Sequence, residues 1–272
     1  MGVAVLMYHG IVNNENDGDN AIHISKKKFE EQMTWLYENK YQIITVSEML
    51  QYFQRKTVPL KSVVLTFDDG YQSLLTNATP ILESFNFSAT LFLLTGAVGK
   101  KSYAEFNTEY SSFPGSDHPL NWSELKTMEG SGWDIQSHSH SHQIHNIIPD
   151  RALELEMRSS KEQIEYNLKK IVSFYSYPCG SYDTRCLQML KKIGYKAAFS
   201  VHPGMAKWSS DIRRLPRIEI DKYVDLDCFK RKVETGFAGT LKKFTSSIKY
   251  ELYRNSRLKD AIKYIYDLRK KI

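Results

Sequence analysis

Short apolar runs rich in β-branched and aromatic residues alternate along the chain with stretches in which apolar residues recur at helical spacing. The runs with the length and composition of buried strands are Val3–Tyr8, Gln42–Thr45, Ser62–Phe67, Ala89–Leu94, Trp133–Gln136, Ser173–Tyr177, Ala197–Ser200 and Arg217–Ile220. Strands that alternate with helices form mostly parallel sheets. The sequence therefore predicts an α/β fold, either a barrel or an open sheet. In both forms, active residues lie at the carboxyl ends of the strands.

The stretches between the strand runs carry helix signals. Two of them have apolar residues at steps of about three or four: Phe29, Met33, Leu36 and Tyr37 in one, and Leu153, Met157, Ile164 and Leu168 in the other. Thr45 with Glu48, and Asn121 with Glu124, have the spacing of a capping box. We therefore expect helices to begin just after Thr45 and just after Asn121.

The composition is that of a folded globular protein. Of the 272 residues, 42% are hydrophobic and 25% are charged, enough for one large core or two small ones. The opening residues 1–9 have no basic segment before their apolar stretch, which predicts a buried strand rather than a signal peptide. Cys179, Cys186 and Cys228 lack CxxC spacing, so they favour neither a disulfide framework nor structural zinc. We expect a cytoplasmic protein.

The positive charge is concentrated at one end of the chain. Residues 241–272 hold ten Lys or Arg against three acidic residues, a formal charge of +7, whereas residues 1–240 hold 27 basic and 28 acidic residues. A near-neutral body argues against a nucleic-acid partner. Residues 100–119 are polar and without a clear period, which predicts a long surface loop. We expect one domain over residues 1–236 and a basic tail over residues 237–272.

The tail has the pattern of one or two cationic amphipathic helices. Its apolar residues recur between Lys and Arg side chains: Leu241, Phe244, Ile248, Leu252, Leu258, Ile262, Ile265, Leu268 and Ile272. One interpretation is an interfacial helix that holds the protein at the anionic inner face of the cell membrane. The other is that the apolar face packs on the rest of the protein and the charges are solvated.

Two adjacent carboxylates follow the strand run Ser62–Phe67. Asp68 and Asp69 would lie at the carboxyl end of a central strand, and Gly70 permits a tight turn beside a ligand. Neighbouring side chains on an extended chain point to opposite sides, so one acid could bind a metal while the other acts as a base. The alternative is that both residues cap a helix that begins near Tyr71.

A histidine cluster follows the strand run Trp133–Gln136. His138 and His142 are spaced i, i+4, which on a helical turn places both imidazoles where one divalent ion can bridge them. With one Asp they offer two nitrogens and one oxygen, a catalytic type of metal site. The alternative is a solvated His-rich loop. His140 and His145 are not expected to be ligands.

These residues resemble the polysaccharide deacetylases of the NodB-homology group, carbohydrate esterase family four. The family's first motif, Thr-Phe-Asp-Asp-Gly, stands intact over residues 66–70, and its second, His-Ser/Thr-x-x-His, stands over residues 138–142. The resemblance covers about residues 3–236. It implies a deformed (β/α) barrel of mostly parallel strands as the catalytic domain, followed by the helical tail.

The resemblance also implies roles for the motif residues. Asp68 would be the catalytic base, and Asp69, His138 and His142 would hold a divalent metal. Zinc is the default ion for two nitrogens and one oxygen, with nickel, cobalt or iron as alternatives.

The family's third motif is matched in part by residues 177–182, where its leading Arg is absent. In the family this loop lines the substrate groove, which here implies Pro178, Cys179, Gly180 and Tyr182. The backbone N–H of Cys179 would hold the oxyanion, so its thiol need not react.

Two further residues complete the implied site. No histidine follows His202, so the family's usual C-terminal general acid is missing. A circularly permuted subset, resembling the poly-N-acetylglucosamine deacetylases, carries this histidine after the first strand, where His9 stands. Arg217 could pair with Asp68 and hold it ionised, or it could form a structural salt bridge only.

The expected function is therefore metal-dependent removal of N-acetyl groups from an amino-sugar polysaccharide or a lipid-linked saccharide. An O-acetyl esterase or a deformylase acting on a glycan would keep the same metal site. A non-catalytic carbohydrate-binding protein of this fold is the alternative from another class.

Overall fold

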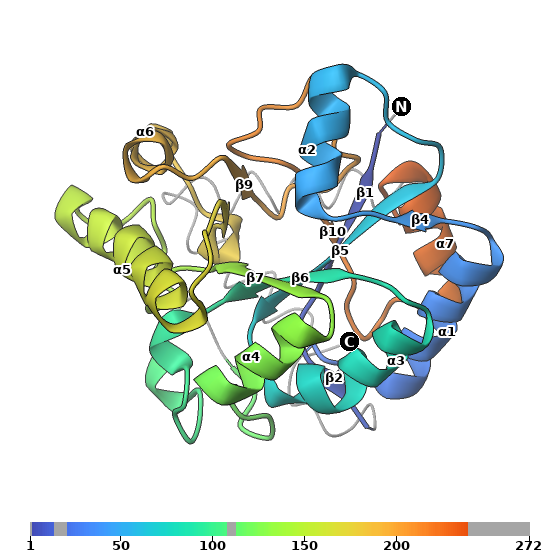
Figure 1. Ribbon diagram of the computed structural model, residues 1–272, viewed down its shortest axis with the longest axis horizontal. Helices are drawn as coiled ribbons and strands as arrows, with labels where there is room; N and C mark the ends of the chain where they lie inside the picture. The colour runs from blue at the N-terminus through green and yellow to red at the C-terminus, as the bar shows by residue number, and fades with distance from the viewer. Residues whose placement is uncertain (1, 14–20, 108–112, 239–272) are drawn as a thin grey trace, which may run out of the picture.

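The computed structural model describes residues 2–13, 21–107 and 113–238 (Figure 1). At its centre is an eight-stranded sheet whose strands are paired in parallel, in the order β10-β1-β5-β6-β7-β8-β9, with β4 beside β5. These strands are β1 (Ala4–Tyr8), β4 (Gln42–Ile43), β5 (Ser62–Asp69), β6 (Ala89–Leu93), β7 (Trp133–Ser137), β8 (Phe174–Ser176), β9 (Ala197–Phe199) and β10 (Ile218–Glu219). The predicted α/β fold is confirmed, and each predicted strand run overlaps one of these strands, with β5 extending two residues and β7 one residue beyond its run.

The sheet curls into a deformed barrel because its two edges are joined. Phe199 in β9 forms a parallel bridge with Leu215, shortly before β10. The N–H of Arg217 donates to the carbonyl of His202 at 3.0 Å, which extends this contact. Because β10 itself pairs with β1, the segment 215–219 links the last strand of the sheet to the first. Of the two predicted forms, the structure has the barrel.

Helices surround the sheet (Figure 1). They are α1 (Lys26–Glu38), α2 (Val46–Arg55), α3 (Thr79–Ser84), α4 (Trp122–Gly130), α5 (Asp150–Leu168), α6 (Thr184–Ile193) and α7 (Leu226–Thr235), with short turns η1 (Leu74–Ala78), η2 (Thr95–Ala97), η3 (Ala104–Phe106) and η4 (Pro178–Gly180). Both predicted capping boxes are present, at Thr45 with Glu48 and at Asn121 with Glu124. A small parallel pair, β2 (Ile11–Val12) with β3 (Ile24–Ser25), was not predicted, because two-residue strands show no alternation in the sequence.

Alternate residues of the central strands pack into two hydrophobic clusters. On β5, Leu65 and Phe67 belong to the larger cluster, which contains residues of the surrounding helices, whereas Val64 belongs to a smaller one. The smaller cluster collects side chains from β1, β5, β6, β8 and β9, among them Phe92 and Phe174, together with buried residues of a single helix, α2 (Val46–Arg55). The rings of Phe92 in β6 and Phe199 in β9 have centroids 5.3 Å apart, although β7 and β8 separate these strands in the sheet. Such a contact forms only on the inner side of a curled sheet. The smaller cluster is therefore its interior core.

The interior positions continue, two residues at a time, to the carboxyl ends of the strands. Asp68 lies four residues after the interior Val64 on β5, and Ser176 lies two residues after the interior Phe174 on β8. Both polar side chains are buried. The fold thus brings polar groups from separate strands to one rim of the barrel.

No helix among the described residues is both long and apolar enough to cross a bilayer. Helix α7 ends at Gly236 with a left-handed backbone, which coincides with the predicted boundary between domain and tail. The tail itself lies, from residue 239 onward, outside the described residues. The boundary and the helical character of the tail stay predictions.

Candidate metal centre

Three side chains approach one another at this rim. Oδ1 of Asp69, at the end of β5, lies 3.6 Å from Nε2 of His138 and 3.8 Å from Nε2 of His142. One donor atom from each residue lies within 4.8 Å of the other two, and all three residues are buried. Two imidazole nitrogens and one carboxylate oxygen are a donor set typical of a catalytic divalent metal.

The hydrogen bonds of His138 and Asp69 leave one lone pair on each side chain for a cation. Nδ1 of His138 lies 2.9 Å from the carbonyl oxygen of Ser176, so this nitrogen carries the proton and Nε2 offers its lone pair. Tyr71 donates its hydroxyl to Oδ2 of Asp69 at 3.1 Å. Oδ1 of Asp69 is buried and, within the described part of the chain, has no hydrogen-bond donor. Burial of a carboxylate oxygen without a donor costs free energy, and a bound cation would offset this cost. These residues therefore fit a divalent metal.

The titration of the three groups supports the same conclusion. Burial, together with the adjacent Asp68 carboxylate, raises the pKa of Asp69 to about 8. Burial lowers the pKa of His138, and burial with the nearby His138 lowers the pKa of His142 well below its usual value. At neutral pH both imidazoles therefore offer unprotonated nitrogens, and a cation would displace a proton from Asp69.

The two adjacent carboxylates both reach the same imidazole. Oδ2 of Asp68 lies 3.8 Å from Nε2 of His138, to which Asp69 also comes close. Asp69 has a left-handed backbone with φ of 74°, and Gly70 follows with φ of 103°. The expectation that these side chains point to opposite sides is wrong, because the chain leaves the extended conformation at Asp69.

The segment from His138 to His142 is a compact turn without helix. Ser139 and His142 have left-handed backbones, with φ of 68° and 58°. The N–H of His142 donates to Oγ of Ser139 at 3.1 Å, and the two imidazole centroids lie 5.0 Å apart. The histidines meet as expected, but the helical turn inferred from their spacing is wrong. A serine side chain closes the turn in place of helical backbone bonds.

The other histidines of the cluster make other contacts. Nδ1 of His140 lies 3.1 Å from Oγ1 of Thr95 and 3.2 Å from Nε2 of Gln163. His145 is buried, and its Nε2 lies 2.5 Å from the hydroxyl of Tyr175. Neither residue belongs to the group of three donors.

Arg217 reaches the second carboxylate of the pair. Its Nη1 and Nη2 each donate to an oxygen of Asp68 at 2.7 Å, and Nη2 also donates to Oγ of Ser176 at 2.8 Å. Arg217 is 1% exposed, so solvent screens this ion pair very little. Burial alone would raise the pKa of Asp68, but Arg217 and His138 outweigh it and hold this pKa below its usual range. Asp68 is therefore ionised at neutral pH.

His9 lies just beyond β1, close enough to Asp68 for each side chain to shift the pKa of the other. Burial lowers the pKa of His9 to about 4, although Asp68 and Glu219 oppose this shift. Its Nδ1 is buried and accepts or donates no hydrogen bond within the described residues. His9 is thus a neutral imidazole at neutral pH, with a ring nitrogen free for a ligand.

The loop after β8 holds the residues of the third motif. Cys179 has φ of 51° and Gly180 has φ of 65°, so the chain turns sharply through left-handed conformations. A Cβ at position 180 would lie 2.8 Å from the backbone nitrogen of Val201, so only glycine fits there. Pro178 and Tyr182 are buried, whereas Cys179 is partly exposed.

The predicted surface loop over residues 100–119 is in part a buried wall of the centre. The Phe113 ring lies edge-on to the His142 ring, with centroids 5.1 Å apart, and stacks on Tyr103 at 5.1 Å. Tyr103 in turn contacts Tyr71 at 4.8 Å. The sequence did not reveal this because the aromatic residues of the loop follow no regular period.

Three further residues that contact this centre, Tyr71, Ser176 and Glu156, were not among the predicted site residues. Tyr71 directly follows the first motif and Ser176 directly precedes the third, so adjacency to a motif was an available signal. Glu156 lies on α5, outside all three motifs. Its carboxylate accepts hydrogen bonds from the turn between His138 and His142. No spacing in the sequence marks it.

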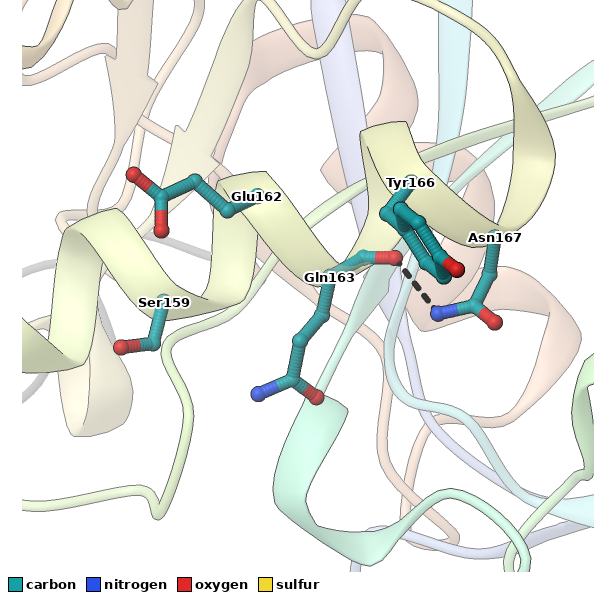
Figure 2. A pocket seen from close by; sticks show the side chains of 5 residues that line it. All are labelled: Ser159, Glu162, Gln163, Tyr166 and Asn167. Carbon is teal, nitrogen blue, oxygen red and sulfur yellow. Dashed lines mark hydrogen bonds between the residues drawn. The ribbon is translucent and has the colours of Figure 1, made fainter.

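Figure 2 shows a surface pocket on α5 (Asp150–Leu168). Its lining residues all come from one helix, α5: Ser159, Glu162, Gln163, Tyr166 and Asn167. It contains none of the predicted site residues.

Comparisons of the sequence with a family model and with known proteins agree on one family. A family model described as polysaccharide deacetylase matches residues 55–198, a range that includes the Asp pair and the histidine turn. YxkH of Bacillus subtilis (strain 168), named as a polysaccharide deacetylase, is 29% identical over 232 residues, which cover 85% of this chain and 76% of YxkH. The poly-beta-1,6-N-acetyl-D-glucosamine N-deacetylase of Staphylococcus aureus (strain COL) is 28% identical over 229 residues, covering 78% of this chain and 74% of that enzyme.

The fold also has a close structural match. The Streptococcus pyogenes deacetylase PplD, solved in complex with acetate, aligns with a TM-score of 0.73 over 86% of this chain and 98% of PplD. The two sequences are 23% identical, so this likeness concerns the fold.

Proposed function

This chain belongs to the polysaccharide deacetylase family, and we propose that it hydrolyses the N-acetyl groups of an amino-sugar polysaccharide, with acetate and free amines as products. One observation carries the proposal. The candidate metal ligands Asp69, His138 and His142 meet a second carboxylate, Asp68, that Arg217 keeps ionised at the same rim of the barrel.

We propose that Asp69, His138 and His142 hold the divalent cation of the family. Such a cation, when bound, polarises the acyl carbonyl and lowers the pKa of a water molecule. Zinc is the ion we propose, because two imidazole nitrogens and one carboxylate oxygen are a common zinc set. Metal analysis of protein purified without added metal, followed by reloading with zinc, nickel, cobalt or iron, tests the choice.

Asp68 is the proposed base. Its carboxylate lies 3.8 Å from Nε2 of His138, next to the candidate ligands, and it is ionised because Arg217 donates two hydrogen bonds to it. It takes the proton of the attacking water as the new C–O bond forms. Because its pKa is low, Asp68 does not retain this proton and can pass it on.

His9 is the proposed acid. Since its pKa is about 4, it has no proton to donate at neutral pH and must first receive one. We propose that it receives the proton that Asp68 took from water and delivers it to the nitrogen as the C–N bond breaks. The hydroxyl of water then resides on acetate and its proton on the amine.

The loop after β8 is proposed to hold the substrate. The backbone N–H of Cys179 would donate to the oxyanion of the tetrahedral intermediate. Pro178, Gly180 and Tyr182 would form the wall of the groove behind it. This assignment gives the Cys179 thiol no chemical role, so Cys179→Ser should retain activity.

The substrate we propose is a polymer or oligomer of N-acetylglucosamine, as the name of the Staphylococcus aureus relative suggests. The test compares acetate release from N-acetylglucosamine oligomers with acetate release from O-acetylated xylan. Release from the amide at a rate that exceeds release from the ester supports the proposal. Hydrolysis of the ester alone would make the protein an esterase, and binding of oligomers without hydrolysis would leave a carbohydrate-binding role. A lipid-linked saccharide and a formylated amino sugar belong in the same panel.

The membrane contact expected of the tail lies outside the described residues and stays a prediction, as does the cytoplasmic location. Co-sedimentation with anionic liposomes, comparing the full chain with a version that ends at Gly236, tests the contact. Equal binding by both proteins would contradict it.

A further inference from the structure

Glu156 on α5 contacts the turn that joins two candidate metal ligands. Its Oε2 accepts hydrogen bonds from the backbone N–H groups of His140, at 3.1 Å, and Ser141, at 2.7 Å. Its Oε1 accepts the hydroxyl of Ser141 at 2.5 Å. All three donors lie between His138 and His142, and Glu156 is only 6% exposed. A carboxylate is withdrawn from water in this way only where hydrogen bonds replace its hydration.

The turn needs support because its conformation is unfavourable. Ser139 and His142, both non-glycine residues, have left-handed backbones, with φ of 68° and 58°. On the side facing η2, the N–H of Gly96 donates to the carbonyl of His140 at 2.8 Å. A Cβ at position 96 would lie 2.4 Å from that oxygen, so the contact is tight. Glu156 and Gly96 therefore hold opposite polar groups of one short turn.

We propose that Glu156 is a positioning residue that presets the distance between the two histidine ligands and so determines the metal affinity of the centre. This inference rests on the proposed metal-dependent function. With Glu156 in place, the left-handed turn exists before the metal arrives. Without it, ordering of the turn must accompany metal binding and weakens it.

The experiment measures the dissociation constant of zinc by competition with a chromophoric chelator, in the full chain and in Glu156→Gln. The amide keeps one acceptor oxygen and places an NH₂ group against a donor of the turn, at nearly unchanged volume. We expect the zinc affinity to fall roughly tenfold or more, as is typical when groups that support metal ligands are removed. The visible spectrum of the cobalt-loaded protein should change as well, since it reports the ligand geometry.

The matched control is Glu162→Gln, which removes the same charge from an exposed position of the same helix (Figure 2). Its zinc affinity and cobalt spectrum should equal those of the unmodified chain. Glu156→Asp, which keeps the charge but is one methylene shorter, should recover part of the affinity.

Zinc affinity of Glu156→Gln within twofold of the unmodified chain would overturn the inference. An equal loss in Glu162→Gln would also overturn it, because the effect would then be a general loss of charge. If metal-free Glu156→Gln does not fold, Ser141→Ala decides, since it removes one donor and leaves Glu156 in place. A zinc affinity of Ser141→Ala below that of the unmodified chain would support the inference, and an unchanged affinity would overturn it. An unmodified chain that binds no zinc contradicts the proposed function instead.

Discussion

At the scale of single residues, the ion pair between Asp68 and Arg217 controls when the proposed base is available. Arg217 lowers the pKa of Asp68, so the carboxylate is ionised at neutral and mildly acidic pH and becomes protonated only as the pH falls through its lowered pKa. Arg217→Lys keeps the charge but loses the two parallel N–H···O bonds. We expect the pKa of Asp68 to rise and the acidic limb of kcat/KM to move to higher pH. A pH profile with an unchanged acidic limb would contradict this role.

His9 gives a second prediction at this scale. His9→Ala should lower kcat for an N-acetylated oligomer by roughly 10²- to 10⁴-fold, the usual contribution of a general acid. The kcat of His9→Ala for an aryl acetate should fall less, because the aryl leaving group departs without a proton. The control is His118→Ala, an exposed histidine whose Nδ1 contacts the carbonyl of Lys101. Equal losses on amide and aryl ester would show that His9 does not protonate the leaving group.

At the scale of elements, the loop after β8 is expected to depend on Gly180. Gly180→Ala places a Cβ against the backbone of Val201 and forces a left-handed alanine, which together should cost about 2–4 kcal/mol. Gly99 is the matched control, because it also has a positive φ but its Cβ would meet no atom within 4 Å. We expect Gly180→Ala to lower the Tm and kcat more than Gly99→Ala does. Similar losses in both variants would mean that the backbone conformation alone matters.

The elements also show how far the sequence predicted the molecule. Buried strands and capped helices were predictable because they depend on neighbouring residues, as at Thr45 with Glu48. The residues of the candidate site were predictable from the two motifs, because Asp68, Asp69, His138 and His142 stand at the motif positions. The resemblance therefore predicts most residues of the candidate site, and in the structure Asp69, His138 and His142 lie close enough together to share a metal ion.

The local backbone of the site was not predictable in the same way. Rules for regular strands and helices fail at Asp69 and at Ser139, where the backbone is left-handed. Contacts over long sequence distances were also hidden, such as those of Glu156 with the histidine turn. Spacing describes regular structure, whereas these contacts depend on how separate elements pack.

At the scale of the whole molecule, the metal is expected to stabilise the fold. A cation that binds only the folded state at 100 times its Kd contributes about 2.7 kcal/mol, which should raise the Tm by roughly 5–10 °C. In the metal-free protein the pKa of Asp69 is raised to about 8, so the folded state binds this proton more tightly than the unfolded state. The contribution of Asp69 to metal-free stability should therefore fall as the pH rises toward 8, while proton competition with the metal at Asp69 weakens.

The difference in Tm between loaded and metal-free protein should accordingly widen from pH 6 to pH 8. Differential scanning calorimetry of both forms measures it, with Asp69→Asn as the control in which the widening should disappear. A difference that stays constant with pH would contradict the assignment of Asp69 as the ligand that exchanges a proton for the metal.

The central claim is that a metal on Asp69, His138 and His142 and the base Asp68 together hydrolyse an N-acetyl amide. The measurement that tests it most directly is acetate release from N-acetylglucosamine oligomers by the zinc-loaded chain, the chelated chain and zinc-loaded Asp68→Asn. We predict release from the loaded chain only, with zinc still bound in Asp68→Asn. Undiminished release after chelation, or from Asp68→Asn, would contradict the account.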